Sequence, residues 1–315
     1  IEIRKTDEVI RKLRHRLCPA DDRIVNDEHG IGISPTAVNL YLQCPLRYYL
    51  TEIEHLREAD KIQEDIAANF FGTILHRALQ NLYGAYGQDI VVTAEIIDKM
   101  LLTLKQTSML EHIYKEEFLR KKTALLLGRD MIPLHVLRQY IERVLQYDKT
   151  LTPFRYLTSE KKYKTFVHLK DGSRIYIHGV IDRVDEAAGQ LRVIDYKTGA
   201  AHSQYVEIDK LFTPQASKSD HLRQTLIYCL LYTAENPEVQ NLTPHLYYVM
   251  QEQLDQLPLK NVQYRQLQEQ MQEQLGIFFE EILNPNIPIQ AKPDNSKKSK
   301  CQYCTFMQFC GVNKE

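Results

Sequence analysis

Two short stretches close together in the chain indicate the fold: residues 179–185 read GVIDRVD, and residues 193–199 read VIDYKTG. Both are strand-like, and the segment EAAGQ between them is typical of a turn, so the pattern predicts two neighbouring antiparallel strands. On the second strand Asp195 and Lys197 are two positions apart, and their side chains therefore leave the same face of the pleat. With Asp182 on the first strand, the stretch brings two carboxylates and one ammonium group toward the same strand ends.

Paired carboxylates beside a lysine suit the hydrolysis of a phosphodiester. The carboxylates hold a hard divalent cation, and the lysine stabilises charge or orients the attacking water. Asp195 follows an apolar strand, where a carboxylate is costly unless it is paired or bound to metal. The alternatives are an exposed hairpin with ordinary surface charges, or a lysine that is only a salt-bridge partner. Glu160 on the preceding strand is a weaker candidate for this site, and Arg183 and Asp185 are expected to be structural.

Further motifs stand before and after this hairpin. Upstream, FGTILHRALQNLY places His76 in a helical segment, and downstream, QTLIY places Gln224 and Tyr228 four apart on one helix face. Taken singly, His76 is more typical of a core or surface histidine, and the Gln224 and Tyr228 face of a polar helix edge. Four cysteines fit a zinc site, a set of disulfides or an iron–sulfur cluster: Cys44 in CPLRYYL, then Cys301, Cys304 and Cys310.

With these motifs in this order, the chain resembles the RecB-like branch of the PD-(D/E)XK nucleases, particularly the AddB-type members that contain an iron–sulfur cluster. The resemblance spans roughly Ser34 to Cys310. It implies an α/β (α+β) fold with a restriction-endonuclease-like core, in which a mixed sheet is flanked by helices, with a helical lobe and a C-terminal cysteine cluster. Periodicity alone supports only the α/β or α+β assignment.

The resemblance also implies the roles of the motif residues. It predicts a site for Mg²⁺ (or Mn²⁺) whose ligands are His76, Asp182, Asp195 and the backbone carbonyl of Tyr196. The residues assigned to catalysis are Asp182, Asp195, Lys197, Gln224 and Tyr228. The ligands assigned to a [4Fe–4S] cluster are Cys44, Cys301, Cys304 and Cys310. Of the two remaining cysteines, Cys229 lies on an apolar helix and is expected to be a core residue.

Together these features lead to the hypothesis of a metal-dependent DNA nuclease. We expect an exonuclease of double-strand break repair and recombination, with the chain as the C-terminal part of a helicase–nuclease. A second hypothesis is a non-catalytic DNA-binding module that the cluster stabilises, and a third is an RNA nuclease, because the phosphodiester chemistry is the same. The expected partners are DNA, with single-stranded ends favoured, and a helicase subunit or domain.

Composition limits the other possibilities. Of the 315 residues 43% are hydrophobic and 26% charged, as in ordinary soluble proteins, and no apolar run approaches the roughly 18–20 residues of a membrane span. Six cysteines without a secretory signal favour ligation over disulfides and predict a cytoplasmic protein without membrane contact. A net charge of −1 argues against a large non-specific DNA-binding surface. The basic clusters are more typical of solvated faces: Arg11 to Arg16, Arg120 to Lys122 and Lys297 to Lys300.

The order of predicted elements divides the chain. Ser34 and Pro35 form a good helix start, with serine as N-cap and proline at the first helical position. Residues 93–150 are mostly helical, with breaks at Thr107-Ser108 and at Gly128 to Pro133, and form a lobe or cap over the site. We predict an N-terminal helix and linker (residues 1–33) followed by a nuclease domain (34–315). The nuclease domain consists of a helical part (34–150), a core (151–285) and a cluster-binding tail (286–315).

Overall fold

The structure is a computed structural model. It describes residues 1–19, 31–56, 66–106, 108–117, 126, 128–199, 207–213, 219–256, 264–292, 301 and 304–311. Two of the basic clusters noted in the sequence, Arg120 to Lys122 and Lys297 to Lys300, lie outside these residues.

A six-stranded mixed sheet forms the centre of the fold, with strand order β2-β3-β4-β5-β6-β7. Neighbouring strands are antiparallel except β5 and β6, which run parallel. A parallel pair needs a crossover connection, and α8 (Asp220–Glu235) supplies it. The strand bounds are β2 Ile90–Val92, β3 Phe154–His168, β4 Arg174–Ala187, β5 Gln190–Lys197, β6 Leu242–Tyr248 and β7 Asp255–Gln256.

The two deciding stretches of the sequence lie on β4 and β5, and the predicted antiparallel pairing is confirmed. Arg183 is opposite Ile194, and Ala187 is opposite Gln190. The turn between the strands has φ values of 51° at Ala188 and 76° at Gly189. Two successive residues with positive φ are the requirement of a type I′ hairpin turn. The mixed sheet with flanking helices confirms the predicted fold class.

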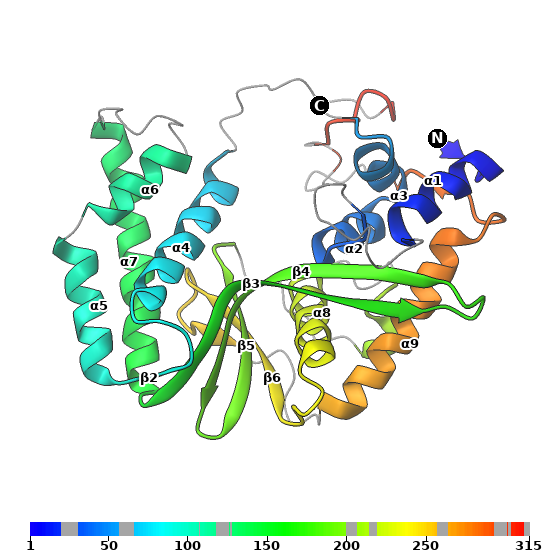
Figure 1. The fold of residues 1–315 in the computed structure, drawn as a ribbon. Helices are drawn as coiled ribbons and strands as arrows, with labels where there is room; N and C mark the ends of the chain where they lie inside the picture. The colour runs from blue at the N-terminus through cyan, green and yellow to red at the C-terminus, as the bar shows by residue number, and fades with distance from the viewer. Residues whose placement is uncertain are drawn as a thin grey trace.

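The helices form two groups at opposite ends of the sheet (Figure 1). One group is α4 to α7, and the other contains α1, α2, α3 and α9. Each group has its own hydrophobic core, and α8 belongs to the second. The bounds are α1 Asp7–Leu17, α2 Pro35–Gln43, α3 Pro45–Tyr48, η3 (a π-helix) Tyr49–Ile53, α4 Ile66–Gly84, α5 Ala94–Gln106, α6 Met109–Glu117, α7 Gly128–Thr150, η4 (a 3₁₀ helix) Ile208–Lys210 and α9 Tyr264–Leu283.

The helix boundaries agree with the sequence at two points and differ at a third. The Ser34 side chain accepts a hydrogen bond from the Ala37 amide at 3.2 Å, as an N-cap does. Helix α5 ends at Gln106 and α6 begins at Met109, so the break expected there is confirmed. The break expected up to Pro133 is wrong, because α7 runs through this proline. Its loss of one backbone hydrogen bond is outweighed by burial of the apolar side chains that follow: Leu134, Leu137 and Ile141.

Short strands at the two ends of the described chain pair with each other. Strand β1 (Glu2–Ile3) is antiparallel to β8 (Ile289–Gln290), although almost the whole sequence separates them. This pair, like the short strands β2 and β7, gives no period-two signal in the sequence.

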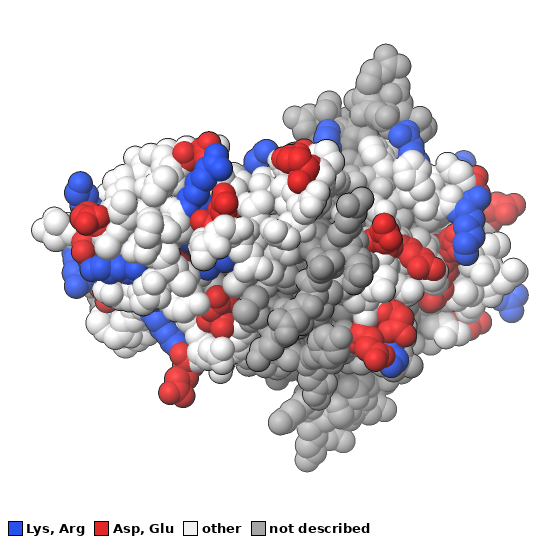
Figure 2. Space-filling view, turned by 90° about the horizontal axis from the view of Figure 1, so that it is seen from below, with Lys and Arg blue, Asp and Glu red and all other residues white. Residues whose placement is uncertain are grey.

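The face of the molecule seen in Figure 2 carries no large field of one sign on its described parts. Seen from below, lysine and arginine side chains alternate with aspartate and glutamate (Figure 2), as the net charge of −1 suggests. No helix within the described ranges combines the length and the apolar character that crossing a membrane requires.

Candidate active site

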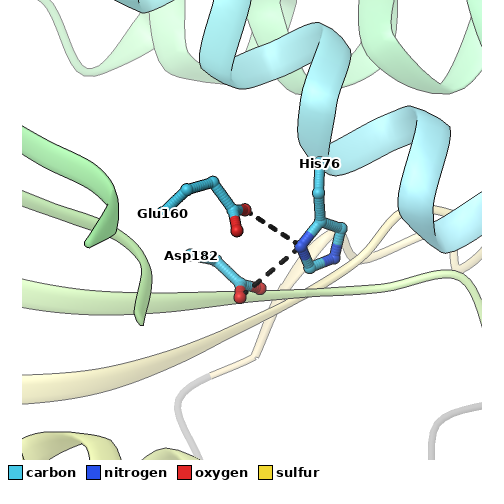
Figure 3. Close-up of side chains that lie close together, drawn as sticks. All are labelled: His76, Glu160 and Asp182. Atoms are coloured by element: carbon cyan, nitrogen blue, oxygen red, sulfur yellow. Dashed lines mark hydrogen bonds and ion pairs between the residues drawn. The ribbon is translucent and has the colours of Figure 1, made fainter. Parts of the chain in front are cut away.

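Three potential metal ligands from three different elements meet at one place. His76 extends from α4, Glu160 from β3 and Asp182 from β4, and the side chains point toward one another (Figure 3). His76 Nδ1 lies 3.2 Å from Glu160 Oε1 and 3.5 Å from Asp182 Oδ1. One ligand atom of each residue lies within 4.8 Å of the other two. A single divalent cation can bridge ligands at this spacing.

Glu160 reaches this position through an irregularity in β3. Its φ of 48° lies in the left-handed region, which is unusual for a non-glycine residue inside a strand. The pairing of β3 with β4 also shifts register between Tyr156 and Thr158. Irregularities of this kind re-aim a side chain and collect near active sites. The local backbone conformation of β3 therefore turns the Glu160 side chain toward His76.

The Tyr196 peptide connects His76 with Asp182. The Tyr196 amide donates a hydrogen bond to Asp182 Oδ2 at 2.8 Å, and His76 Nε2 lies 3.2 Å from the Tyr196 carbonyl oxygen. This carbonyl is thus held beside the two side chains with which it was predicted to share a metal. The resemblance had placed all three in one ligand set, across more than a hundred residues of sequence.

Asp195 and Lys197 lie on the side of β5 that faces α8. Lys197 Nζ is 2.6 Å from Asp195 Oδ2 and donates to Gln224 Oε1 at 3.1 Å. Gln224 in turn donates to the Tyr228 hydroxyl at 2.8 Å. Four of the five residues assigned to catalysis, all except Asp182, therefore form one continuous chain of polar contacts. Thr225, which the sequence analysis did not single out, donates to Asp195 Oδ2 at 3.5 Å.

Asp195 and Asp182 are not equivalent in their contacts with His76. Asp182 belongs to the tight three-ligand group, whereas Asp195 does not, within the part of the chain that the structure describes. Asp195 nevertheless acts electrostatically on His76. The same group contains Glu160, which the sequence analysis held to be only a weaker candidate. Asp195 lies on the next strand, β5, where it pairs with Lys197.

Burial and mutual repulsion perturb the titration of this site. Burial raises the pKa of Asp195 to about 6 against the opposing charge of Lys197, and it also raises the pKa of Asp182. Burial would lower the pKa of His76, but the Asp182 and Glu160 carboxylates outweigh it and raise this pKa to about 9. Three carboxylates thus share a small volume with one histidine and one lysine.

The donor set fits a divalent cation. Asp195 Oδ1 is buried and has no hydrogen-bond partner among the described residues, and Asp195 itself is only 1% exposed. An unpaired buried carboxylate oxygen is costly, and such groups are normally paired or coordinate a metal. The oxygen-rich set with one imidazole suits Mg²⁺ or Mn²⁺.

A cavity of about 500 Å³ opens onto this site. Its wall includes His76 and Glu160 together with polar and basic residues of α4 and the end of β5: Thr73, Arg77, Gln80 and Thr198. Arg77 is held by two acidic residues of α6, at 2.9 Å from Glu116 and through a further ion pair with Glu117. Helix α4 therefore supplies one wall of the cavity.

Comparison with known proteins agrees with this geometry. The sequence profile of the PD-(D/E)XK nuclease superfamily matches residues 32–311. The chain belongs to this superfamily. The family expected from the motifs is therefore confirmed, and the site described above lies within the matched residues.

Individual relatives of the chain come from Streptococcus pyogenes. Each is named as one subunit of an ATP-dependent helicase/deoxyribonuclease; those from serotypes M3 and M18 are 25% identical to the chain over 174 residues, and one from serotype M12 is 24% identical. The match covers 54% of this chain and 14% of each relative. The chain is thus similar to a small part of a much longer protein.

The four cysteines predicted to hold a cluster gather at the other end of the superfamily fold. All four are of intermediate burial and outside any disulfide among the described residues, and Cys44 is the residue between α2 and α3. Burial raises the pKa of the Cys310 thiol, and the charges of Cys44, Cys304 and Cys301 raise it further. Cys310 is therefore within electrostatic range of the other three thiols. Among the described residues, no three of their sulfurs lie mutually within 4.8 Å.

A buried ionic network supports the metal strands from behind. Arg183 on β4 is 2.6 Å from Asp148 Oδ2 of α7, pairs with Asp185, and donates to the Tyr196 hydroxyl at 3.3 Å. The Arg183 guanidinium also lies 4.5 Å from the centre of the Tyr83 ring. The structural role expected for Arg183 and Asp185 agrees with these contacts. The contribution of Asp148, 35 positions away, has no signal in the sequence.

Proposed function

We propose that the chain is a metal-dependent deoxyribonuclease that acts as an exonuclease on DNA in double-strand break repair and recombination. The observation that carries the proposal is the orphaned, buried Oδ1 of Asp195 beside Lys197, next to the group of His76, Glu160 and Asp182. Membership of the nuclease superfamily and the similarity to helicase/deoxyribonuclease subunits support it.

The residues that would hold the metal are His76, Asp182, Asp195 and the Tyr196 carbonyl, with Glu160 as an additional carboxylate. When bound, Mg²⁺ or Mn²⁺ would polarise the phosphate, acidify a water and offset the charge on the leaving group. Metal ligation requires the His76 imidazole to be neutral. His76 must therefore release the proton that Asp182 and Glu160 now stabilise.

The proposed role of Lys197 is to assist the attack on phosphorus. Its ammonium group is held by Asp195 at 2.6 Å and by Gln224 at 3.1 Å, which leaves one of its three N–H groups to donate to another acceptor. Such a fixed ammonium can hold the attacking water or stabilise developing charge without reorganisation. Gln224 and Tyr228 orient Lys197 through their own hydrogen bond. Their helix α8 also offers polar groups to the nucleic acid.

We further propose that the four cysteines bind a [4Fe–4S] cluster. A single zinc ion with Zn–S bonds of about 2.3 Å would need sulfurs roughly 4 Å apart, whereas among the described residues no three of these sulfurs lie mutually within 4.8 Å. Four thiolates are the usual ligands of the larger cluster. Cys44 and Cys301 are 257 positions apart. By the loop-entropy estimate for a cross-link, tying them together stabilises the fold by on the order of 5 kcal/mol. The cluster's role is then structural, since hydrolysis needs no electron transfer.

The partners that fit this activity are DNA, with single-stranded ends favoured, and a helicase subunit or domain that feeds such ends to the site. The near-neutral charge of the chain supports a modest, salt-dependent affinity for DNA. A helicase would compensate for that modest affinity by delivering the strand.

A cleavage assay with labelled nucleic acids tests this proposal. Anaerobically purified protein is incubated with linear single-stranded, linear double-stranded and closed circular DNA, and with linear RNA, in Mg²⁺, Mn²⁺ or EDTA. We expect metal-dependent cleavage of linear DNA and none of closed circles. Equal cleavage of closed circles would identify an endonuclease, and cleavage of RNA alone would reassign the substrate. DNA binding without cleavage in either metal would leave the non-catalytic DNA-binding module as the function.

A further inference from the structure

A second pocket, remote from the metal site, lies between α1 and the π-helix η3. Its volume is about 280 Å³. The charged and titratable side chains that line it are Arg11, Lys12, His15, Arg16, Glu52 and His55. Three of these are permanently cationic and one is a carboxylate. The first four are spaced by one and four positions along α1 and therefore share one helix face.

The cations in this pocket are only partly neutralised. Lys12 is fully engaged, at 2.8 Å from Glu54 and 3.6 Å from Glu8. Arg16 uses one nitrogen, Nη2, to contact Glu52 at 3.1 Å. No ion pair with Arg11 is found among the described residues. Cations four positions apart on a helix repel one another unless something offsets their charge, so an anion bound in the pocket would be stabilised by these side chains.

Unpaired polar atoms of Arg16, which lines the pocket, also favour a bound anion. Arg16 Nε and Nη1 are buried, and within the described parts of the chain they have no hydrogen-bond partner. The hydroxyl of Tyr48 on α3 is also buried and unpaired there. Burial raises the pKa of Tyr48, and the charge of Arg16 opposes the rise. Buried donors without acceptors are rare in folded proteins.

The backbone that forms the opposite wall is unusual as well. Residues Tyr49–Ile53 form a π-helix, and His55 follows with a φ of 53°. Both features are uncommon and are found disproportionately at functional sites. Together they bring His55 and the segment after α3 to the same pocket as the α1 cations.

We propose that this pocket binds a backbone phosphate of the nucleic-acid strand whose other end occupies the metal site. Guanidinium forks and imidazoles are the groups that recognise a phosphate. This inference rests on the proposed nuclease function, and it gives the Arg11–Arg16 cluster a binding role in place of the solvated face that the sequence suggests.

The position of the pocket determines how long a bound strand must be. Arg14, on the same helix, is 2.9 Å from Asp171 in the turn between β3 and β4. Glu160 of the metal site lies on β3, eight residues before the strand ends at His168. At about 3.3 Å per residue this stretch spans roughly 25 Å. A strand therefore needs several nucleotides to contact both sites.

The test measures binding of a fluorescent 20-nucleotide single strand in EDTA over a range of salt concentrations. Arg11→Ala is compared with the matched control Arg14→Ala, which removes the same charge from the same helix but from a residue paired with Asp171. We expect Arg11→Ala to weaken binding and to reduce the slope of log K against log salt by about 0.7, the value for one phosphate contact on a single strand. Arg14→Ala should leave the slope unchanged.

Two further arms identify the source of the phosphate. Replacing chloride by inorganic phosphate at constant ionic strength should weaken DNA binding by the wild type more than by Arg11→Ala. An oligonucleotide of four residues should bind both proteins alike. Equal slopes for Arg11→Ala and Arg14→Ala would overturn the proposal, and if phosphate still raised the melting temperature of the wild type, the pocket would be a site for free phosphate.

A small substrate separates this proposal from the nuclease function itself. Bis(p-nitrophenyl) phosphate can reach the metal site alone, so Arg11→Ala should hydrolyse it at the wild-type rate. Asp195→Asn should lose this hydrolysis and keep the wild-type salt slope for the long strand. Absence of hydrolysis by the wild type would contradict the nuclease function, whereas an unchanged slope in Arg11→Ala contradicts only the phosphate pocket.

Discussion

Asp195→Asn should abolish cleavage and yet stabilise the metal-free protein. Asp195 is 1% exposed, and burial raises its pKa from 3.8 to about 6. Because the folded pKa lies above the unfolded one, protonation of Asp195 favours the fold, and this stability is lost as pH rises from about 4 through about 6. Asparagine resembles the protonated acid at every pH, so the variant keeps what the wild type loses.

The size of the effect follows from the same shift. At 1.36 kcal/mol for each pKa unit, the variant gains up to about 3 kcal/mol at pH 8. In a chain of this length that corresponds to a melting temperature higher by roughly 5 °C. Thermal unfolding in EDTA should show this rise at pH 8 and its disappearance near pH 4. Saturating Mn²⁺ should then stabilise the wild type but not the variant, because binding to the folded state alone raises stability.

A second buried carboxylate supplies the control. Asp185 accepts two hydrogen bonds from Arg192, at 2.6 and 2.8 Å, and also pairs with Arg183. Asp185→Asn leaves buried arginines without their partner and should destabilise the protein by about 3–5 kcal/mol. An Asp195→Asn variant that melts at or below the wild-type temperature in EDTA at pH 8 would rule out this explanation, since Asp195 would then contribute to the fold rather than strain it.

Three other outcomes are expected. Mn²⁺ must displace the proton of His76, whose pKa is about 9. The affinity for Mn²⁺ measured by calorimetric titration should therefore rise about tenfold per pH unit between pH 7 and 8. The His76→Gln variant should lose this pH dependence. Cys44→Ala should remove iron from anaerobically purified protein and lower its melting temperature sharply, whereas Cys229→Ala should keep its iron; stoichiometric zinc in place of iron would reject the cluster. Arg183→Met should lower the free energy of unfolding in urea by about 3–5 kcal/mol, because Asp148 would be left buried without its charge partner, and an unchanged value would contradict the structural role of this network.

The central hairpin could be predicted because its signals are local. Alternation of side chains along β5 puts Asp195 and Lys197 on one face, and the turn at Ala188 and Gly189 fixes how β4 pairs with β5. The N-cap of α2 at Ser34 could be predicted for the same reason, since capping depends on neighbouring residues.

The rest of the site depends on long-range packing that no local pattern encodes. His76 was identified only through the family resemblance, because nothing in its helix signals the strands that it meets. Glu160 joins the ligand group through a positive φ and a register shift, and neither can be read from its neighbours. The unpaired Arg16 donors could not be predicted either, since a basic run in a sequence does not indicate which of its cations form ion pairs in the fold.

Cleavage of a 5′-labelled single strand as a function of Mg²⁺ concentration, by the wild type, Asp195→Asn and Asp185→Asn, is the decisive experiment for the proposed active site. We expect saturable, EDTA-sensitive cleavage by the wild type, none by Asp195→Asn at any Mg²⁺ concentration, and residual cleavage by whatever fraction of Asp185→Asn is folded. Mg²⁺-dependent cleavage by Asp195→Asn at the wild-type rate would show that the chemistry takes place elsewhere in the molecule.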